Sequence, residues 1–136
     1  MRVIIGYGNE LRGEDAFGID TIKELQKLEL KNTKLLSMHQ LTPELVLQLL
    51  DADEIVFIDV SYDAKNHYAL ACSLTEQNNL NLSHHISPKT IICMLKSLYT
   101  KSPKFFIYSM ISKNFEKIED AKRYKKCINR VTEHLL

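Results

Sequence analysis

The sequence predicts an α/β fold: a three-layer sandwich in which a mainly parallel, twisted sheet carries helices on both faces. Short β-branched runs alternate along the chain with stretches of helical apolar spacing, the pattern expected of such folds. Two runs, RVIIGY and EIVFIDV, are largely apolar, as expected of strands buried on both faces of a parallel sheet. With 136 residues, 45% of them hydrophobic, the chain can bury one core, so we predict a single domain over residues 1–136.

Apolar periodicity and helix-start signals predict the individual elements. Strands are expected over residues 2–7, 31–41, 54–60, 68–74 and 104–110, and helices over residues 17–28, 43–50, 88–99 and 118–136. Thr42-Pro43 and Ser87-Pro88 are polar–proline pairs typical of an N-cap and a first helical residue. The residues expected to pack inward are Ile19, Ile22, Leu25 and Leu28 on the first helix, and Ile91, Met94, Leu95 and Leu98 on the third.

Charge content argues against two classes of partner, and cysteine content indicates the cellular compartment. Eighteen basic and seventeen acidic residues leave a net charge of +1, so neither nucleic acid nor an anionic membrane is expected as a partner. Residues 101–136 hold nine Lys/Arg and four Asp/Glu, a local net of +5 that we interpret as a solvated helix face rather than a site for an acidic partner. Three widely spaced cysteines, no signal peptide and no long apolar run favour a cytoplasmic protein.

All four glycines lie in one segment, GYGNELRGEDAFG, between the first strand and the first helix. A dinucleotide fingerprint would need a third glycine where Leu11 stands, and a Walker A loop would need a terminal Gly-Lys-Ser/Thr. Glu14 and Asp15 also place negative charge where a phosphate needs free N–H groups. The loop therefore presents negative charge, and a small nucleotide-binding protein is disfavoured.

Polar residues follow several predicted strands. Asp15 could simply cap the first helix, but Asp59 arrives at the end of a central strand, and the carboxyl ends of parallel strands meet at one edge. His84 or His85, just before a helix, could approach the two acids, although a surface or capping role is the simpler interpretation of either histidine. Two carboxylates and an imidazole suit a divalent ion such as Ni²⁺ or Zn²⁺ with open coordination positions.

No nucleophile pattern competes with this acidic site. A GxSxG elbow is absent, and Cys93 is expected on the apolar stripe of its helix as an inert core thiol. His39, His67 and His134 have no acidic or thiol context, so we interpret them as surface or packing residues.

These motifs resemble those of the hydrogenase maturation proteases, small α/β endopeptidases that remove a C-terminal extension from the large subunit of [NiFe] hydrogenases. The resemblance covers nearly the whole chain, through GYGNELRGEDAFG, FIDV, SHHISP and the closing helix. It implies that Asp15, Asp59 and His84 are both metal ligands and catalytic residues. SHHIS fits the family's Ser-His-x-(Leu/Ile)-Ser pattern only if His84, and not His85, is the ligand.

The resemblance also implies a cofactor and a partner. The metal is expected to be nickel presented by the large-subunit precursor, with zinc or another divalent ion able to occupy the site in vitro. Glu14 is then a flanking residue that points elsewhere. The residues expected to shape the loop are Gly6, Gly8, Asn9, Gly13 and Gly18. The alternative function is a catalytically silent, metal-dependent checkpoint module for hydrogenase assembly.

One segment departs from the family pattern. Many members carry a Gly-Gly-Thr element after the second strand that helps to select the cognate hydrogenase. The corresponding residues here are His39, Gln40, Leu41, Thr42, Pro43 and Glu44. With Leu45 they form HQLTPEL, which, together with GYGNELRGED, resembles the subgroup that serves NAD-reducing bidirectional (Hox-type) hydrogenases.

Overall fold

One five-stranded sheet organises the chain. The computed structural model describes residues 1–62, 70–73, 86–112, 117–118 and 120–136. Its strands are β1 (Arg2–Tyr7), β2 (Thr33–Met38), β3 (Glu54–Tyr62), β4 (Leu70–Ser73) and β5 (Lys104–Ser112), in the spatial order β2-β1-β3-β5-β4. The first four strands in that order pair in parallel, and β4 pairs antiparallel with β5. The predicted, mainly parallel sheet is confirmed.

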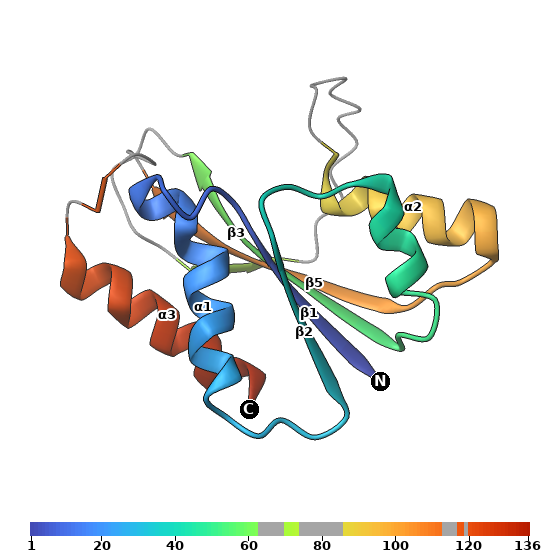
Figure 1. Cartoon of the computed structure of the whole chain (residues 1–136), viewed down its shortest axis with the longest axis horizontal. Coiled ribbons are helices and arrows are strands. Elements are labelled where there is room, and N and C mark those ends of the chain that lie inside the picture. Colours follow the sequence, from blue (N-terminus) through green and yellow to red (C-terminus); the bar gives the residue numbers. More distant parts are fainter. Residues whose placement is uncertain (63–69, 74–85, 113–116, 119) are drawn as a thin grey trace.

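Helices cover both faces of the sheet. In Figure 1, α1 (Phe17–Gln26) and α3 (Ala121–Leu135) lie together on one side. On the other side lie α2 (Pro88–Tyr99) and the 3₁₀ helix η2 (Pro43–Gln48). A short 3₁₀ turn, η1 (Gly13–Ala16), leads into α1. The predicted three-layer arrangement is confirmed.

Alternate strand residues serve two separate cores, because successive side chains point to opposite faces of a sheet. The sheet residues that pack beneath α1 and α3 are Ile4, Val56, Ile58 and Met110. Those that pack beneath α2 and η2 are Val3, Ile5, Ile55, Phe57 and Ile107. The position of a residue along its strand therefore decides which helical layer its side chain meets.

The observed starts of two helices agree only in part with those predicted from the sequence. The hydroxyl of Ser87 accepts a hydrogen bond from the Thr90 backbone N–H at 3.2 Å, so the predicted N-cap of α2 is confirmed. The helix expected at Pro43 is instead a 3₁₀ helix, and the Thr42 side chain does not cap it. The Leu45 N–H donates to the Thr42 carbonyl at 3.1 Å, which is the three-residue spacing of that helix type.

Three residues expected in the core lie at the surface. Leu28 follows the last residue of α1 by two positions, and its side chain is 37% exposed. Leu98 belongs to the last turn of α2 and is 65% exposed. Cys93 is exposed as well, because it stands two residues, about 200° of helical rotation, from buried Ile91.

The start of α1 packs directly against the ends of β1 and β3. A Cβ atom on Gly18 would lie 2.4 Å from the Ile58 carbonyl oxygen and 2.7 Å from the Tyr7 nitrogen. Gly8, with φ of +144°, would bring a Cβ to 2.0 Å from the Asp15 carbonyl oxygen. The close approach of helix and strands therefore requires hydrogen in place of a side chain at both positions.

We expect Gly18→Ala to lower the free energy of unfolding by about 1–3 kcal/mol, because the added methyl meets backbone atoms that cannot rotate away. Urea unfolding followed by circular dichroism measures the change. Lys23→Ala, at an exposed position of the same helix, should change stability by no more than about 0.5 kcal/mol. Equal stabilities of Gly18→Ala and wild type would contradict the close packing described here.

Candidate active site

The order in which successive strands are added to the sheet reverses at β1. β2, which follows β1 along the chain, lies on one side of it, and β3 lies on the other. Ligands of open α/β sheets bind outside the carboxyl ends of the strands at such a switch point. The loop after β1 and the end of β3 meet there, at the upper left of Figure 1. Asp15 and Asp59 come from these two segments.

Asp15 is held within its own loop rather than by the helix that follows it. Its Oδ2 accepts a hydrogen bond from the backbone N–H of Asn9 at 3.1 Å, while its own N–H donates to the Arg12 carbonyl at 2.8 Å. The N-cap of α1 is Ala16, and no side chain caps this helix. The simple capping role of Asp15 is therefore not what the structure shows.

Asp59 is held by side chains from the two strands beside it. The Tyr7 hydroxyl, from β1, donates to Asp59 Oδ2 at 2.7 Å. The Ser109 hydroxyl, from β5, donates to Asp59 Oδ1 at 2.5 Å. Both carboxylate oxygens thus have a donor, which compensates in part for removing the group from water.

The electrostatics of Asp59 reflect its burial and its acidic neighbour. Burial raises the pKa of Asp59, and the negative charge of Asp15 raises it further, while hydrogen bonds from Ser109 and Tyr7 act in the opposite direction. Burial, followed by the charge of Asp59, raises the pKa of Tyr7 far above its usual value, so this hydroxyl remains a donor. The two acids thus lie close enough to interact, and a cation between them would relieve their repulsion.

Glu14 occupies the opposite side of the loop from this site. Its side chain is fully buried, and its charge contributes to the raised pKa values of Tyr124 and Cys127, both of α3. Burial is the larger cause of both shifts. Tyr124 also donates to Asp20 Oδ2 of α1 at 2.5 Å. The expectation that Glu14 points away from Asp15 agrees with this placement, but its complete burial was not anticipated.

The third predicted ligand lies outside the described residues. Neither His84 nor His85 is described, so their choice stays a prediction, and the same holds for His67. Among the residues that the structure describes, no group of three His, Cys, Asp or Glu side chains could hold a metal ion. The described part of the site supplies two oxygen donors, Asp15 and Asp59, which suit a divalent cation that takes its remaining ligands elsewhere.

Two further residues at Asp59 were missed by sequence reasoning. Tyr7 and Ser109 lie on strands far from Asp59 in sequence, and the apolar pattern does not reveal which residues stand side by side. Strand parity is the signal that could have found Tyr7, because Tyr7 follows buried Ile5 by two residues and therefore shares its face of the sheet.

The predicted specificity segment begins at the same edge. The Gly8 N–H donates to the Met38 carbonyl at 3.2 Å, which ties the end of β1 to the end of β2 immediately before His39. The exposed residues of the segment are His39, Gln40, Pro43 and Glu44. Leu41 is only 4% exposed and belongs to the core beneath η2. Four of the six residues are therefore accessible beside the acidic site.

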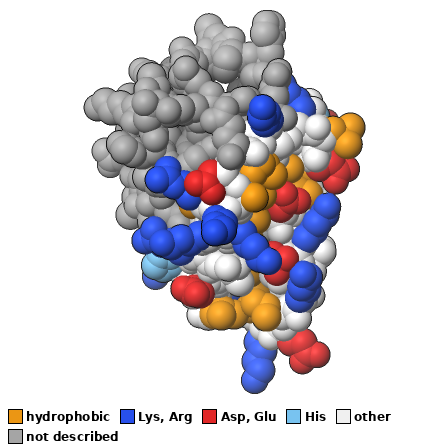
Figure 2. Space-filling model, turned by 90° about the vertical axis from the view of Figure 1, so that its left-hand side faces the viewer, with side chains coloured by type: hydrophobic (Ala, Val, Ile, Leu, Met, Phe, Trp, Pro, Cys, Tyr) orange, Lys and Arg blue, Asp and Glu red, His pale blue; other side chains and the backbone are white. Residues whose placement is uncertain are grey.

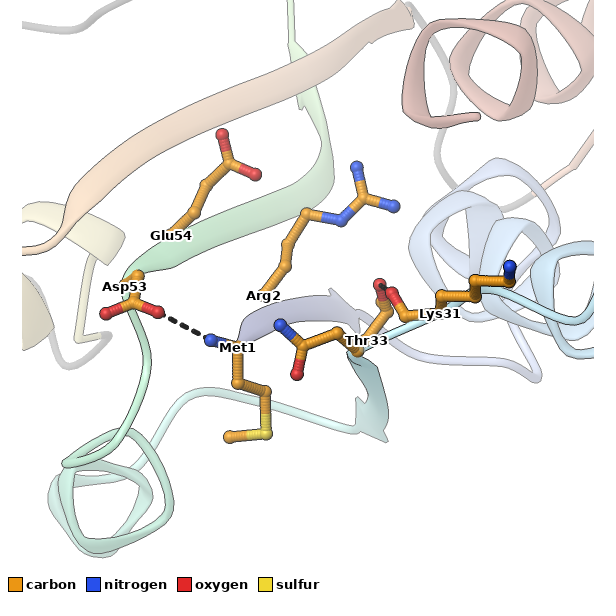
Figure 3. A pocket seen from close by; sticks show the side chains of 7 residues that line it. Met1, Arg2, Lys31, Thr33, Asp53 and Glu54 are labelled. Atoms are coloured by element: carbon orange, nitrogen blue, oxygen red, sulfur yellow. Dashed lines mark hydrogen bonds and ion pairs between the residues drawn. The ribbon is translucent and has the colours of Figure 1, made fainter.

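A shallow hollow of about 380 Å³ lies at the opposite edge of the sheet, at the amino ends of the strands (Figure 3). The Met1 amino group forms an ion pair of 2.6 Å with Asp53, whose side chain is 87% exposed. Arg2 donates through Nη2 to the Leu135 carbonyl at 2.7 Å. These contacts tie the chain ends to the sheet, and the hollow contains no pair of buried acids comparable to the candidate site.

The outer face of α3 carries the predicted excess of positive charge. Its exposed basic residues are Lys122, Arg123, Lys125, Lys126 and Arg130. Figure 2 shows Lys and Arg side chains interspersed with Asp and Glu on this side of the molecule. One such pair is an ion pair in which Arg123 Nε lies 3.5 Å from Asp120 Oδ2. The mixed signs agree with a solvated helix face. Within the described residues, no helix is both long and apolar enough to span a membrane.

We expect Asp59→Asn to stabilise the folded protein, and to do so more at pH 8 than at pH 4. The folded state holds the Asp59 proton more tightly than the unfolded chain, so ionisation costs stability as pH rises above the ordinary value of 3.8. The amide removes this cost. Urea unfolding of both proteins at the two pH values measures it, and a constant difference would contradict the raised pKa.

Asp53→Asn provides a control of opposite sign. The Met1 amino group lowers the pKa of Asp53, so this carboxylate contributes stability above pH 3.8 that is lost as pH falls through its lowered pKa. The variant should therefore be no more stable than wild type at pH 8, with a small difference because the pair is exposed.

Comparison with known proteins identifies the fold. No known protein-family model matches the sequence. No curated protein shows significant similarity to it. Among solved structures, the chain is similar to the [NiFe] hydrogenase maturation protease HycI from Thermococcus kodakarensis KOD1, at 18% identity and a TM-score of 0.79, covering 98% of this chain and 88% of that one. It is also similar to the hydrogenase maturating endopeptidase HybD from E. coli, at 18% identity and a TM-score of 0.77, covering 99% and 89%. The chain has the fold of these maturation proteases.

Proposed function

We propose that the chain is an endopeptidase that removes the C-terminal extension from a nickel-loaded [NiFe] hydrogenase large-subunit precursor. The observation that carries the proposal is the meeting of Asp15 and Asp59 at the carboxyl edge of a fold shared with solved maturation endopeptidases. One acid lies in the loop after β1 and the other at the end of the neighbouring strand β3, and the pKa of Asp59 is raised by burial and by the charge of Asp15. Such a pair forms a site that a cation would stabilise.

In this proposal Asp15, Asp59 and His84 bind the nickel of the precursor, which is part of the substrate. The precursor's nickel would polarise the scissile carbonyl or orient the attacking water. Water then adds to the carbonyl carbon, the C–N bond breaks, and the leaving amine takes a proton. The role of this chain is to place the two carboxylates and the imidazole around the nickel, so that only a loaded precursor is aligned for cleavage.

The selectivity of the enzyme is proposed to reside in residues 39–44. Support comes from the exposure of His39, Gln40, Pro43 and Glu44, and from the hydrogen bond between Gly8 and Met38 that sets this segment beside the acidic loop. The resemblance of the segment to that of the Hox-type subgroup suggests a bidirectional hydrogenase as the source of the precursor. A cytoplasmic location is proposed with it, because three widely spaced cysteines without a CxxC pair suit a reducing compartment.

We expect Asp15→Asn, Asp59→Asn and His84→Ala each to abolish cleavage of a nickel-loaded Hox-type large-subunit precursor, because each removes a ligand. Mass spectrometry of the precursor after incubation with purified protein measures cleavage, and circular dichroism confirms that each variant is folded. Asp53→Asn, at the opposite edge, should cleave like wild type. His85→Ala should do so too, and a damaging His85→Ala with a neutral His84→Ala would reverse the histidine assignment.

The same assay separates an enzyme from a checkpoint module. A wild-type protein that binds the loaded precursor without shortening it would overturn the peptidase proposal and favour the catalytically silent alternative. Precursor prepared without nickel is the matched substrate control, and it should remain uncut.

Replacing the exposed residues His39, Gln40 and Glu44 together by alanine should weaken the preference for the Hox-type precursor over precursors of other hydrogenases. Leu41 is kept because it packs in the core, so the variant should remain folded. The ratio of kcat/KM values for two precursors measures the preference. An unchanged ratio would mean that selectivity lies elsewhere on the surface.

A further inference from the structure

We infer that Tyr7 and Ser109 are positioning residues that hold the carboxylate of Asp59 from both sides in the orientation that ligation requires. Neither residue belongs to the predicted ligand set. The inference rests on the proposed role of Asp59 as a metal ligand, and it adds two residues that would act through it.

The three side chains form one row across adjacent strands. Asp59 of β3 stands opposite Ser109 of β5 in the parallel register. Gly6 of β1 stands opposite Ile58, so Tyr7, the next residue, lies beside Asp59. The residue two positions before each of these three packs beneath α2 and η2. The side chains of Tyr7, Asp59 and Ser109 therefore share that face of the sheet.

The preceding row shows how unusual this polar row is. Ile5 pairs with Phe57, and Phe57 pairs with Ile107, so two residues earlier the same three strands present only apolar, buried side chains. The change from an apolar row to a hydroxyl–carboxylate–hydroxyl row occurs at the carboxyl edge, where Asp15 also arrives. Packing alone would be served as well by apolar residues at both flanking positions.

The two hydroxyls restrict the carboxylate in a specific way. The Tyr7 hydroxyl donates to Oδ2 at 2.7 Å and the Ser109 hydroxyl donates to Oδ1 at 2.5 Å, so rotation of the carboxylate about its Cβ–Cγ bond would displace both oxygens from the positions at which they accept these hydrogen bonds. Each oxygen keeps a further lone pair for a cation, since a carboxylate offers about four acceptor sites. Hydrogen-bonded partners that fix a ligand in this way typically contribute about 10- to 100-fold to metal affinity or activity.

Single and double removal of the hydroxyls tests the inference. Tyr7→Phe and Ser109→Ala are compared with wild type by calorimetric titration with Ni²⁺ alone and by cleavage of the nickel-loaded precursor. We expect the double variant to weaken Ni²⁺ binding about 10- to 100-fold and to lower kcat, with little change in KM for the precursor. Ser109→Thr keeps the hydroxyl and should restore the values lost in Ser109→Ala.

Tyr108→Phe is the matched control. It removes a tyrosine hydroxyl one residue from Ser109, but Tyr108 packs with the core beneath α1 and α3, on the other face of the sheet. This variant should keep wild-type Ni²⁺ affinity and kcat. Urea unfolding of every variant shows whether it is folded at the assay temperature, and the single variants replace the double variant if that protein unfolds.

A folded double variant with wild-type Ni²⁺ affinity and kcat would overturn the positioning inference and leave the proposed function standing. A wild type that neither binds Ni²⁺ nor cleaves the precursor would instead overturn the proposed function. In that case, crystal structures of wild type and the double variant test the positioning inference independently of the proposed function. A rotated Asp59 carboxylate in the double variant supports it, and an unchanged orientation overturns it.

Discussion

The site depends on a close approach of two backbone segments, where β1 meets α1 at Gly6 and Gly18. A Cβ atom on Gly6 would lie 2.1 Å from the Gly18 carbonyl oxygen, and one on Gly18 would strike atoms of both β1 and β3. This approach fixes the loop between the two glycines over the strand ends. The charge of Asp15 acts on Asp59, and the start of the following helix close to the sheet accounts for this proximity. The layers on either side can then be filled by ordinary apolar packing.

The buried carboxylate of Asp59 lowers the stability of the fold when it is ionised, but two neighbouring hydroxyls hold it in place. Burial and the charge of Asp15 disfavour its ionised form, whereas Tyr7 and Ser109 favour it. The net result is a carboxylate that is oriented but whose ionised form remains disfavoured, which agrees with the proposal that this site receives a cation. Glu14 and Asp15, adjacent in sequence, take opposite roles because one faces the core beneath α3 and the other faces this site.

Much of the fold follows from local sequence. The bounds of β1 were predicted as observed, the Ser87 cap is present, and the convergence of Asp15 and Asp59 follows from the rule that parallel strands end at one edge. The antiparallel direction of β4 was not predicted, because an apolar run carries no direction. Tyr7 and Ser109 were missed since their contacts depend on register between distant strands. His84 stays a prediction, as it lies outside the described residues.

Because successive side chains of β3 point to opposite faces of the sheet, this strand tolerates substitutions better than deletions. A substitution at Val56 or Phe57 acts within one of the two cores, and the solved structures show that the same fold is kept at 18% identity. Deletion of one β3 residue before Asp59 has a different effect, because it would turn Asp59 toward α1 and α3 and place an apolar side chain between Tyr7 and Ser109. The length of β3 before Asp59 is therefore a stricter requirement than the identity of any one apolar residue in it.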